Sequence, residues 1–400
     1  MKFKLSNLAL AGLFASVGAQ AQISGDVVKI GFLTDMASVY ADLDGAGGAE
    51  AIKMAIADHK GMVAGKKIEF VFADHQNKAD VAASKAREWF DTQGVDLLVG
   101  GTNSGAALAM AKVAAEKKKP FISIGAGSAR LTNEDCTPYT IHYAYDTVAL
   151  ANGTGSAVTK GGGKTWYFLT ADYAFGTSLQ ADATTVITKS GGKVLGSVKH
   201  PLNASDFSSF LLQAQGSGAQ ILGLANAGGD TVNAIKAANE FGITKSMKMA
   251  GLLMFINDIH SLGLKTTQGM YMTDSWYWNE SPEARAWARR FFEKVKRMPS
   301  SVQAADYSAV SHYLDAIDKT KTDDGDKIMA AMKAMPVNDF YAQGTVRAQD
   351  GRFVHDMFLL QVKTPAESTE PWDYFKVVQK IPGEEAYTKL SESKCPLVKK

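Results

Sequence analysis

Small residues and hydroxyls follow two of the apolar runs that the sequence predicts to be strands. The first run ends in the loop GGTNSG and the second in GAGSAR. The residues concerned are Ser104 in the first loop and Gly125, Ala126, Gly127 and Ser128 in the second. Both loops lead into helical stretches, where backbone N–H groups without an intrahelical partner can bind an anionic oxygen, such as that of a carboxylate. The two serines could equally cap their own helices, and the two roles are compatible.

Aromatic and polar side chains follow other predicted strands. Tyr173 and Phe175 come directly after TWYFLT, and Tyr40 lies in the loop after the first strand. Rings at a strand end can stack on an apolar ligand, although packing against a neighbouring helix is the commoner use of an aromatic side chain. Asn226 follows ILGLA and could hydrogen-bond a ligand or cap the next helix.

Signatures of catalysis and of metal binding are missing from the sequence. Residues 45–50 read GAGGAE, which lacks the last glycine of a dinucleotide fingerprint and lies about ten residues beyond its strand. Neither Ser104 nor Ser128 lies in G-x-S-x-G, and there is no P-loop or H-E-x-x-H motif. The 7 histidines are scattered, without the spacing of metal ligands. We therefore expect a binding protein with no catalytic residue, metal or cofactor.

Strand-like and helical runs alternate in two successive sets. The expected strands are 27–34, 68–73, 97–99 and 121–124, then 165–170, 194–198, 221–225 and 247–252. The expected helices are 49–57, 79–92 and 105–117, then 178–189, 207–215 and 231–241. Alternation of this kind predicts parallel sheets covered by helices on both faces, and two sets predict two α/β lobes. Ligands of such sheets bind beyond the carboxyl ends of the strands, where the loops described above lie.

The order of elements changes after residue 269. We expect a strand at 270–273, helices at 283–297, 304–320 and 326–335, and strands at 357–362 and 374–378. The glycine-rich stretch 153–163 is typical of a boundary between lobes. We expect the chain to return to the first lobe and then to cross once more.

The first 21 residues have the layout of a secretory signal peptide. Lys2 and Lys4 precede a short apolar run, and Ala19-Gln20-Ala21 offers small residues for cleavage. The formal charge is +2, and removal of both lysines would make the mature chain neutral, which argues against nucleic acid as a partner. In an exported chain the 2 cysteines, Cys136 and Cys395, favour a disulfide over two free thiols.

The order and spacing of several stretches resemble the branched-chain amino acid type of ABC-transporter solute-binding proteins, which have the type I periplasmic binding fold. The stretches are KIGFLTDMASVYADLDGAGGAEAIKMAIAD at 29–58, LLVGGTNSGAALAMAKVAAEKKKPFISIGAGSARLT at 97–132, TWYFLTADYAFGTSLQADA at 165–183, PLNASDFSSFLLQAQGSGAQILGLANAGGDT at 201–231 and the final CPLV.

The resemblance implies two doubly wound lobes joined by three crossovers. Lobe 1 would comprise 26–144 and 274–346, lobe 2 would comprise 145–273 and 347–380, and a tail, 381–400, would return to lobe 1. It also implies a monomer in the periplasm, a solute enclosed by lobe closure, and the permease and ATPase of an importer as partners. The family's binding positions match Ser104, the loop from Gly125 to Ser128, and Phe175 with Tyr173 close by.

One departure from the family concerns the ligand's charge. Members that bind amino acids hold the ammonium group with an acidic residue after the strand expected at 247–252, where this chain has Leu252, Leu253, Met254 and Phe255. Ala227 also replaces an aromatic residue of the family. An ammonium group buried there would lack a counter-charge. We therefore expect a carboxylate ligand with an apolar or aromatic body, as in the aromatic-acid subgroup. A branched-chain or neutral amino acid, or a sensor role for the same fold, is the alternative.

Overall fold

The first lobe is built on a six-stranded sheet with the order β2-β3-β1-β4-β5-β6. The computed structural model describes residues 23–399, so the expected signal peptide lies outside the described residues. The strands are β1 (Val27–Thr34), β2 (Met62–Val63), β3 (Lys66–Asp74), β4 (Leu97–Gly100), β5 (Phe121–Ser123) and β6 (Thr140–His142). Strand β1 pairs in parallel with β3 and β4, and its residues from Ile30 to Thr34 are buried. This strand is the centre of the first-lobe core.

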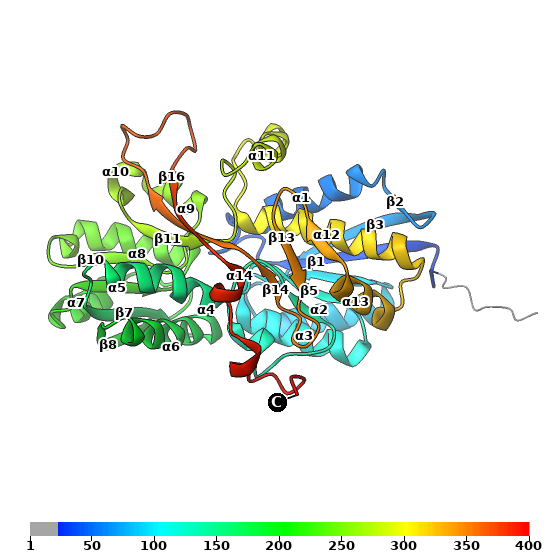
Figure 1. Ribbon diagram of the computed structural model, residues 1–400, viewed down its shortest axis with the longest axis horizontal. Helices are drawn as coiled ribbons and strands as arrows, with labels where there is room; N and C mark the ends of the chain where they lie inside the picture. Colours follow the sequence, from blue (N-terminus) through cyan, green and yellow to red (C-terminus); the bar gives the residue numbers. More distant parts are fainter. Residues whose placement is uncertain (1–22, 400) are drawn as a thin grey trace, which may run out of the picture.

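Helices cover both faces of this sheet (Figure 1). They are α1 (Gly45–Asp58), α2 (Ala79–Thr92), α3 (Ser104–Lys117) and α12 (Ser301–Thr320). Two further helices of this lobe lie outside them, since α11 (Pro282–Val295) packs on α1 and α13 (Gly325–Ala334) packs on α12. Several begin at a residue whose side chain accepts a hydrogen bond from the first turn, as Asn103 does for α3 and Ser281 for α11. Helix α12 has a reciprocal capping box between Ser300 and Gln303. None of the helices within residues 23–399 is long and apolar enough to cross a membrane.

The second lobe contains a four-stranded parallel sheet with the order β10-β9-β7-β8. Its strands are β7 (Thr165–Ala171), β8 (Lys193–His200), β9 (Ile221–Ala225) and β10 (Lys248–Gly251). Its helices are α6 (Ala174–Lys189), α7 (Ser208–Gly216), α8 (Gly228–Glu240), α9 (Ile256–Leu262) and α10 (Leu264–Thr267). The two separate sheets confirm the expected α/β architecture of two lobes.

Two small antiparallel sheets lie where the chain passes between the lobes. One consists of β11 (Tyr271–Asp274), β15 (Met357–Val362) and β16 (Phe375–Ile381). The other consists of β12 (Pro336–Asn338), β13 (Gln343–Val346) and β14 (Phe353–His355). Strand β14 still pairs with β13, so the chain leaves the first lobe after His355 and not at residue 346 as expected. The strands of this hairpin are too short for an alternating pattern of side chains to be visible in the sequence.

The glycine-rich stretch that was expected to mark a boundary between the lobes is largely helical. Residues 147–160 form a helical segment made of α4 (Thr147–Leu150), a π-helical turn (Ala151–Gly155) and α5 (Ser156–Lys160). The first crossing lies before this segment, at residues 143–146. Gly153 packs so closely on Thr273 that a Cβ atom there would lie 2.1 Å from the Thr273 hydroxyl oxygen. The glycines therefore serve close packing against β11.

The first crossing is held by a buried arginine that comes directly before β14. The guanidinium group of Arg352 donates to the backbone oxygens of Tyr143 (2.7 Å), Tyr145 (3.0 Å) and Phe353 (3.0 Å). It also lies 4.0 Å from the ring centre of Tyr387 and 3.9 Å from the carboxylate of Asp146. Because the side chain is fully buried, these contacts are what offset the loss of its hydration.

The C-terminal segment crosses the hinge before it reaches the first lobe. The short helix α14 (Gly383–Ala386) lies against the helical segment 147–160. There the Asn152 side chain donates to the backbone oxygens of Glu385 and Ala386. The chain then ends on the first lobe, where Cys395 forms a disulfide with Cys136. Such a bond, closing a loop with a sequence separation of 259 residues, tethers the tail to a lobe that is already well packed.

Two carboxyl groups face each other in the first-lobe core. The side chains of Asp44 and Asp306 are fully buried, and one oxygen of each lies beside Gly48. Burial raises the pKa of Asp44 to about 6, although hydrogen bonds with Asp306 and Thr34 oppose the rise. Burial and the charge of Asp44 raise the pKa of Asp306 well above its ordinary value. The pair therefore holds at least one proton when the protein is folded at neutral pH.

We expect this pair to make the protein less stable as the pH rises. The native pKa values lie above those of the unfolded chain, so the native state binds more protons between about pH 4 and pH 8 and stability falls across that window. Asp306→Asn should reduce the loss of unfolding free energy between pH 5 and pH 8 by about 2 kcal/mol, measured by urea denaturation. The exposed Asp80→Asn serves as the control. An unchanged pH dependence in Asp306→Asn would contradict the shared proton.

Candidate ligand-binding site

A narrow cavity lies between the two lobes, at the carboxyl ends of their strands. Its volume is about 10 Å³, so the closed lobes leave almost no free space between them. The lining residues are Tyr40, Leu43, Thr102, Gly125, Gly127 and Tyr145 from the first lobe and first crossing, and Tyr173, Phe175, Ala227, Leu253 and Phe255 from the second lobe. This volume is far below the roughly 300–1,000 Å³ of pockets for drug-sized ligands, so the lobes must separate to admit a solute.

The first-lobe wall is formed by the loops after β4 and β5. Among the described residues, the backbone N–H groups of Thr102, Gly125 and Gly127 have no hydrogen-bond acceptor. Helix α3 begins just beyond Thr102, and the N-terminus of a helix favours negative charge. A side chain at position 127 would collide with the ring of Phe175, because a Cβ atom would lie 2.7 Å from it. The loops therefore present free N–H groups, and the glycine lets the opposite lobe approach them.

Aromatic rings enclose the remainder of the cavity. The ring centres of Tyr173 and Phe175 are 6.0 Å apart, and those of Tyr145 and Phe255 are also 6.0 Å apart. The hydroxyls of Tyr40 and Tyr173 form a hydrogen bond across the two lobes. Burial raises the pKa of both phenols, so both stay protonated at any physiological pH. The rings offer an apolar surface with hydroxyl groups at one edge.

The carboxylate of Asp35 fixes the loop that carries Tyr40. It accepts hydrogen bonds from the backbone N–H groups of Ser38 and Tyr40 (both 2.9 Å) and from the side chain of Asn77 (2.7 Å). Thr102 also contacts this loop through the N–H group of Asp35 (3.3 Å). These bonds use the acid for positioning, and it does not line the cavity.

No residue that lines the cavity is acidic or basic. Asp258 is the acid that follows the Leu253–Phe255 run, but its carboxylate is turned to the N–H group of Phe255 (2.9 Å) at the start of α9. Burial raises the pKa of Asp258 to about 7, so this carboxyl group is only partly ionised at neutral pH. Among residues 23–399, no group of three His, Cys, Asp or Glu side chains could hold a metal ion.

Hydrogen bonds between the lobes hold the cavity closed. The backbone N–H of Gly229 donates to the carbonyl oxygen of Val39 (2.9 Å), and the hydroxyls of Ser128 and Ser178 are 2.8 Å apart. On the same side, the Asn257 side chain donates to the backbone oxygen of Asp42 (3.0 Å). The structure is therefore a closed form, in which hydrogen bonds join the two lobes around the cavity.

Six of the ten expected site residues line the cavity. They are Tyr40, Gly125, Gly127, Tyr173, Phe175 and Leu253. The expected loops do meet in one cleft, as the rule for parallel sheets predicts.

The other four expected residues lie beside the cavity and have partners of their own. The Ser104 hydroxyl accepts from the N–H of Ser128 (3.1 Å) and so ties the two first-lobe loops together. The Ser128 hydroxyl contacts Ser178 in the second lobe. The backbone oxygen of Ala126 contacts the ring of His142 (2.6 Å). The Asn226 side chain is held by His200 (3.0 Å) and Thr231 (2.6 Å).

Sequence reasoning missed five residues that line the cavity. Leu43, Thr102, Ala227 and Phe255 belong to stretches that the sequence singled out, and each lies within a few residues of an expected position. Tyr145 had no such signal, because it comes from the first crossing and reaches the cavity only through the hinge geometry. Its hydroxyl donates to the backbone oxygen of Gly125 (2.7 Å).

Known proteins resemble the chain in sequence and in fold. A periplasmic binding protein from Burkholderia mallei is 67% identical, superposes with a TM-score of 0.93, and covers 94% of this chain and 100% of its own. A branched-chain amino acid ABC transporter periplasmic ligand-binding protein from Burkholderia xenovorans is 39% identical, with a TM-score of 0.82, and covers 93% of this chain and 100% of its own. The Leu/Ile/Val-binding protein homolog 6 of Brucella melitensis is 24% identical over 323 residues, which is 78% of each chain.

The match to a family model extends over most of the sequence. The model described as periplasmic binding protein covers residues 27–369, which contain both lobes and every residue that lines the cavity. The chain therefore belongs to the periplasmic binding protein family.

Proposed function

We propose that this protein is the extracytoplasmic solute-binding component of an ABC importer and that it captures a small aromatic or apolar carboxylic acid by lobe closure. The observation that carries the proposal is a closed cavity with free backbone N–H groups on one wall, aromatic rings on the others and no charged side chain. The family to which the chain belongs consists of binding proteins, and the protein is not an enzyme.

The free N–H groups favour an anionic oxygen at the first-lobe wall. A carboxylate placed at Gly125 and Gly127 would receive hydrogen bonds from groups that otherwise have no acceptor among the described residues. Hydrogen bonds to a charged acceptor are stronger than those between neutral groups. The rings of Phe175 and Tyr173 would then face the apolar body of the solute.

The absence of an acid from the lining argues against an ammonium group on the ligand. Burial of an unpaired ammonium ion costs several kcal/mol, and none of the lining residues could repay it. Proteins of the same fold support an aromatic acid. One from Rhodopseudomonas palustris BisB5 was solved in complex with 3,4-dihydroxy benzoic acid, at 24% identity, with a TM-score of 0.81 and coverage of 90% of this chain and 98% of its own.

The remaining parts of the proposal follow from the family. A periplasmic location agrees with the family's name and with the leader that the first 21 residues indicate. We expect a monomer that delivers its solute to a membrane permease served by an ATPase. An amino acid ligand is the second candidate, because the Burkholderia xenovorans relative is described as a branched-chain amino acid transporter protein.

A ligand screen separates the two candidates. We expect benzoate, 4-hydroxybenzoate or phenylacetate to raise the melting temperature and to bind in calorimetry, while leucine, isoleucine and phenylalanine do neither, because an ammonium group would be buried without a counter-charge. Tight binding of leucine with no response to any aromatic acid would overturn the proposed ligand class.

Phe175 should contribute most of the contact with the ring of the solute. Phe175→Ala removes a buried aromatic face and should weaken binding of the best acid from the screen by roughly 30-fold or more, as anchors of this kind do. Phe241→Ala removes an exposed ring from the same lobe and should leave affinity unchanged. Equal affinities in the two variants would remove Phe175 from the site.

Closure should depend on the absence of a side chain at position 228. Gly228 has a φ of +56°, and a Cβ atom there would lie 2.3 Å from the backbone oxygen of Val39 in the opposite lobe. Gly228→Ala should therefore prevent full closure and weaken binding by roughly tenfold or more, mainly through faster dissociation. At Gly229 a Cβ atom would lie 3.5 Å from Val39, so Gly229→Ala is the matched control.

The measurement combines dissociation kinetics with small-angle X-ray scattering of the liganded protein. The Gly228→Ala variant should remain more extended than wild type in the presence of ligand, whereas the melting temperature of the free protein changes little. If both alanine variants close and bind as wild type does, the contact between Gly228 and Val39 has no role in closure.

A further inference from the structure

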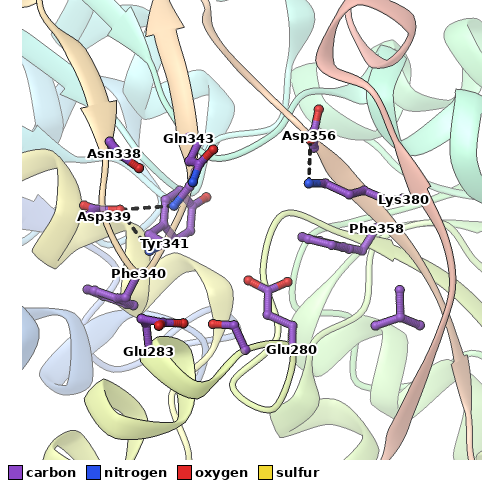
Figure 2. Close-up of a pocket in the computed structure, with 13 residues that line it drawn as sticks. Glu280, Glu283, Asn338, Asp339, Phe340, Tyr341, Gln343, Asp356, Phe358 and Lys380 are labelled. Carbon is purple, nitrogen blue, oxygen red and sulfur yellow. Dashed lines mark hydrogen bonds and ion pairs between the residues drawn. The ribbon is translucent and has the colours of Figure 1, made fainter.

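A second and larger hollow lies behind the hinge, away from the ligand cavity. It encloses about 870 Å³, and it shares no residue with the cavity described above. Its walls are the hairpin 338–343 of the first lobe, the strands β15 and β16, and the start of α11. Figure 2 shows these walls facing one another across an open space. We call this space the hinge groove.

The carboxyl group of Glu280 projects into the hinge groove (Figure 2). One of its oxygens is buried and has no hydrogen-bond partner among the described residues. Burial and repulsion from Asp274 raise the pKa of Glu280 to about 8, although Lys380 opposes the rise. A buried acceptor without a partner is costly, so this carboxyl group favours a ligand that can satisfy it.

The other acids of the groove differ from Glu280. The carboxylate of Asp339 accepts from the hydroxyl of Ser308 (2.6 Å) and from the N–H groups of Tyr341 (2.9 Å) and Ala342 (3.1 Å). Asp356 forms an ion pair with Lys380 (2.9 Å). Glu283 is exposed at the rim. These groups make the groove acidic overall, while Glu280 is the acid that lacks a partner.

The apolar walls indicate the body of the ligand. Phe340, Phe358 and Val377 line the groove, and Val377 has 45% of its surface exposed. Phe340 is held firmly because its ring stacks on Trp287 at 4.4 Å with an interplanar angle of 13°. A bare metal ion would find no group of three ligands among residues 23–399. An organic cation would use both the acid and the rings.

We propose that the hinge groove binds an organic ammonium ion with an apolar body, and that the carboxylate of Glu280 is its counter-charge. The charge complementarity between an acidic groove and a cation, together with the aromatic walls, selects this class of ligand. The proposal is independent of the acid bound in the main cavity, since the two sites have no residue in common.

Binding of the cation should release a proton. At pH 7 the Glu280 carboxyl group of the free protein is mostly protonated, because its pKa is raised to about 8. The ammonium ion favours the ionised form, so it takes the place of the proton. Affinity should therefore increase as the pH rises from 6.5 to 8.5, a range over which a primary alkylamine stays protonated.

The test is calorimetric titration of the full protein with 2-phenylethylamine. At pH 7, titrations in two buffers of different ionisation enthalpy should give a release of close to one proton per bound amine. Glu280→Gln keeps the shape of the side chain and should lower the affinity by roughly tenfold or more and abolish the proton release. Glu283→Gln, at the exposed rim, is the control and should change the affinity by about twofold or less.

Three outcomes would overturn the proposal. They are no binding of the amine by wild type at millimolar concentration, equal affinity in wild type and Glu280→Gln, and displacement of the amine by equimolar sodium or calcium chloride. If Glu280→Gln lowers the melting temperature, the test rests on the wild-type protein alone. Wild type should then release close to one proton per bound amine at pH 7 and bind the amine more tightly as the pH rises, and absence of either effect contradicts the proposal. The screen of acids tests the main cavity, and the titration with the amine tests the hinge groove. A negative result in one experiment therefore does not affect the interpretation of the other.

Discussion

The backbone oxygens of the first crossing need hydrogen-bond donors, and one buried arginine provides them. Residues 143–146 run between the lobes outside any helix or strand, so their carbonyl groups have no ladder partners. Arg352, which comes directly before β14, binds two of these carbonyls and pairs with Asp146, which caps α4. The ring of His355 contacts the backbone oxygens of Tyr143 (3.2 Å) and Ala144 (2.9 Å) beside it. The position of the hinge is thus fixed by side chains that arrive more than 200 residues later in the sequence.

This hinge contact also reaches the ligand cavity. Tyr145 binds Arg352 through its backbone oxygen, while its side chain lines the cavity and its hydroxyl binds Gly125. A change in the angle between the lobes must therefore move or strain a residue that lines the cavity. The lobes and the cavity behave as one mechanical unit, because interiors packed this closely do not deform gradually.

The main cavity and the hinge groove differ in the charge of the side chains that line them. No Asp, Glu, Lys, Arg or His side chain lines the main cavity, so we expect its selectivity to come from backbone N–H groups and neutral rings. The hinge groove has acids at its centre and rim. The buried acids Asp44, Asp258 and Glu280 all have raised pKa values, so in the folded protein their charge is reduced by bound protons. Proton binding is how this fold tolerates carboxyl groups in its interior.

The sequence predicted most of the regular elements because their patterns are local. Strand 27–34 and helix 79–92 have the predicted limits, and helix 283–297 differs by one or two residues at each end. The strands that were missed are β2, β6 and β12 to β14, each of two to four residues, and the short helices α4, α5, α9, α10 and α14 were missed as well. Strands this short have too few side chains for a period of two to be visible. They form because neighbouring segments of the folded chain provide hydrogen-bond partners. Those partners are known only from the tertiary structure.

The site was predictable where it depends on strand ends and unpredictable where it depends on the fit of the two lobes. The rule for parallel sheets located the loops of Gly125 and Phe175. It could not show that Gly127 leaves the space into which the Phe175 ring packs, or that Gly228 lies against the backbone oxygen of Val39. Both contacts join the lobes, and both require the absence of a Cβ atom. The small size of the cavity follows from them, because glycines at these two points allow the lobes to approach until almost no free space remains between them.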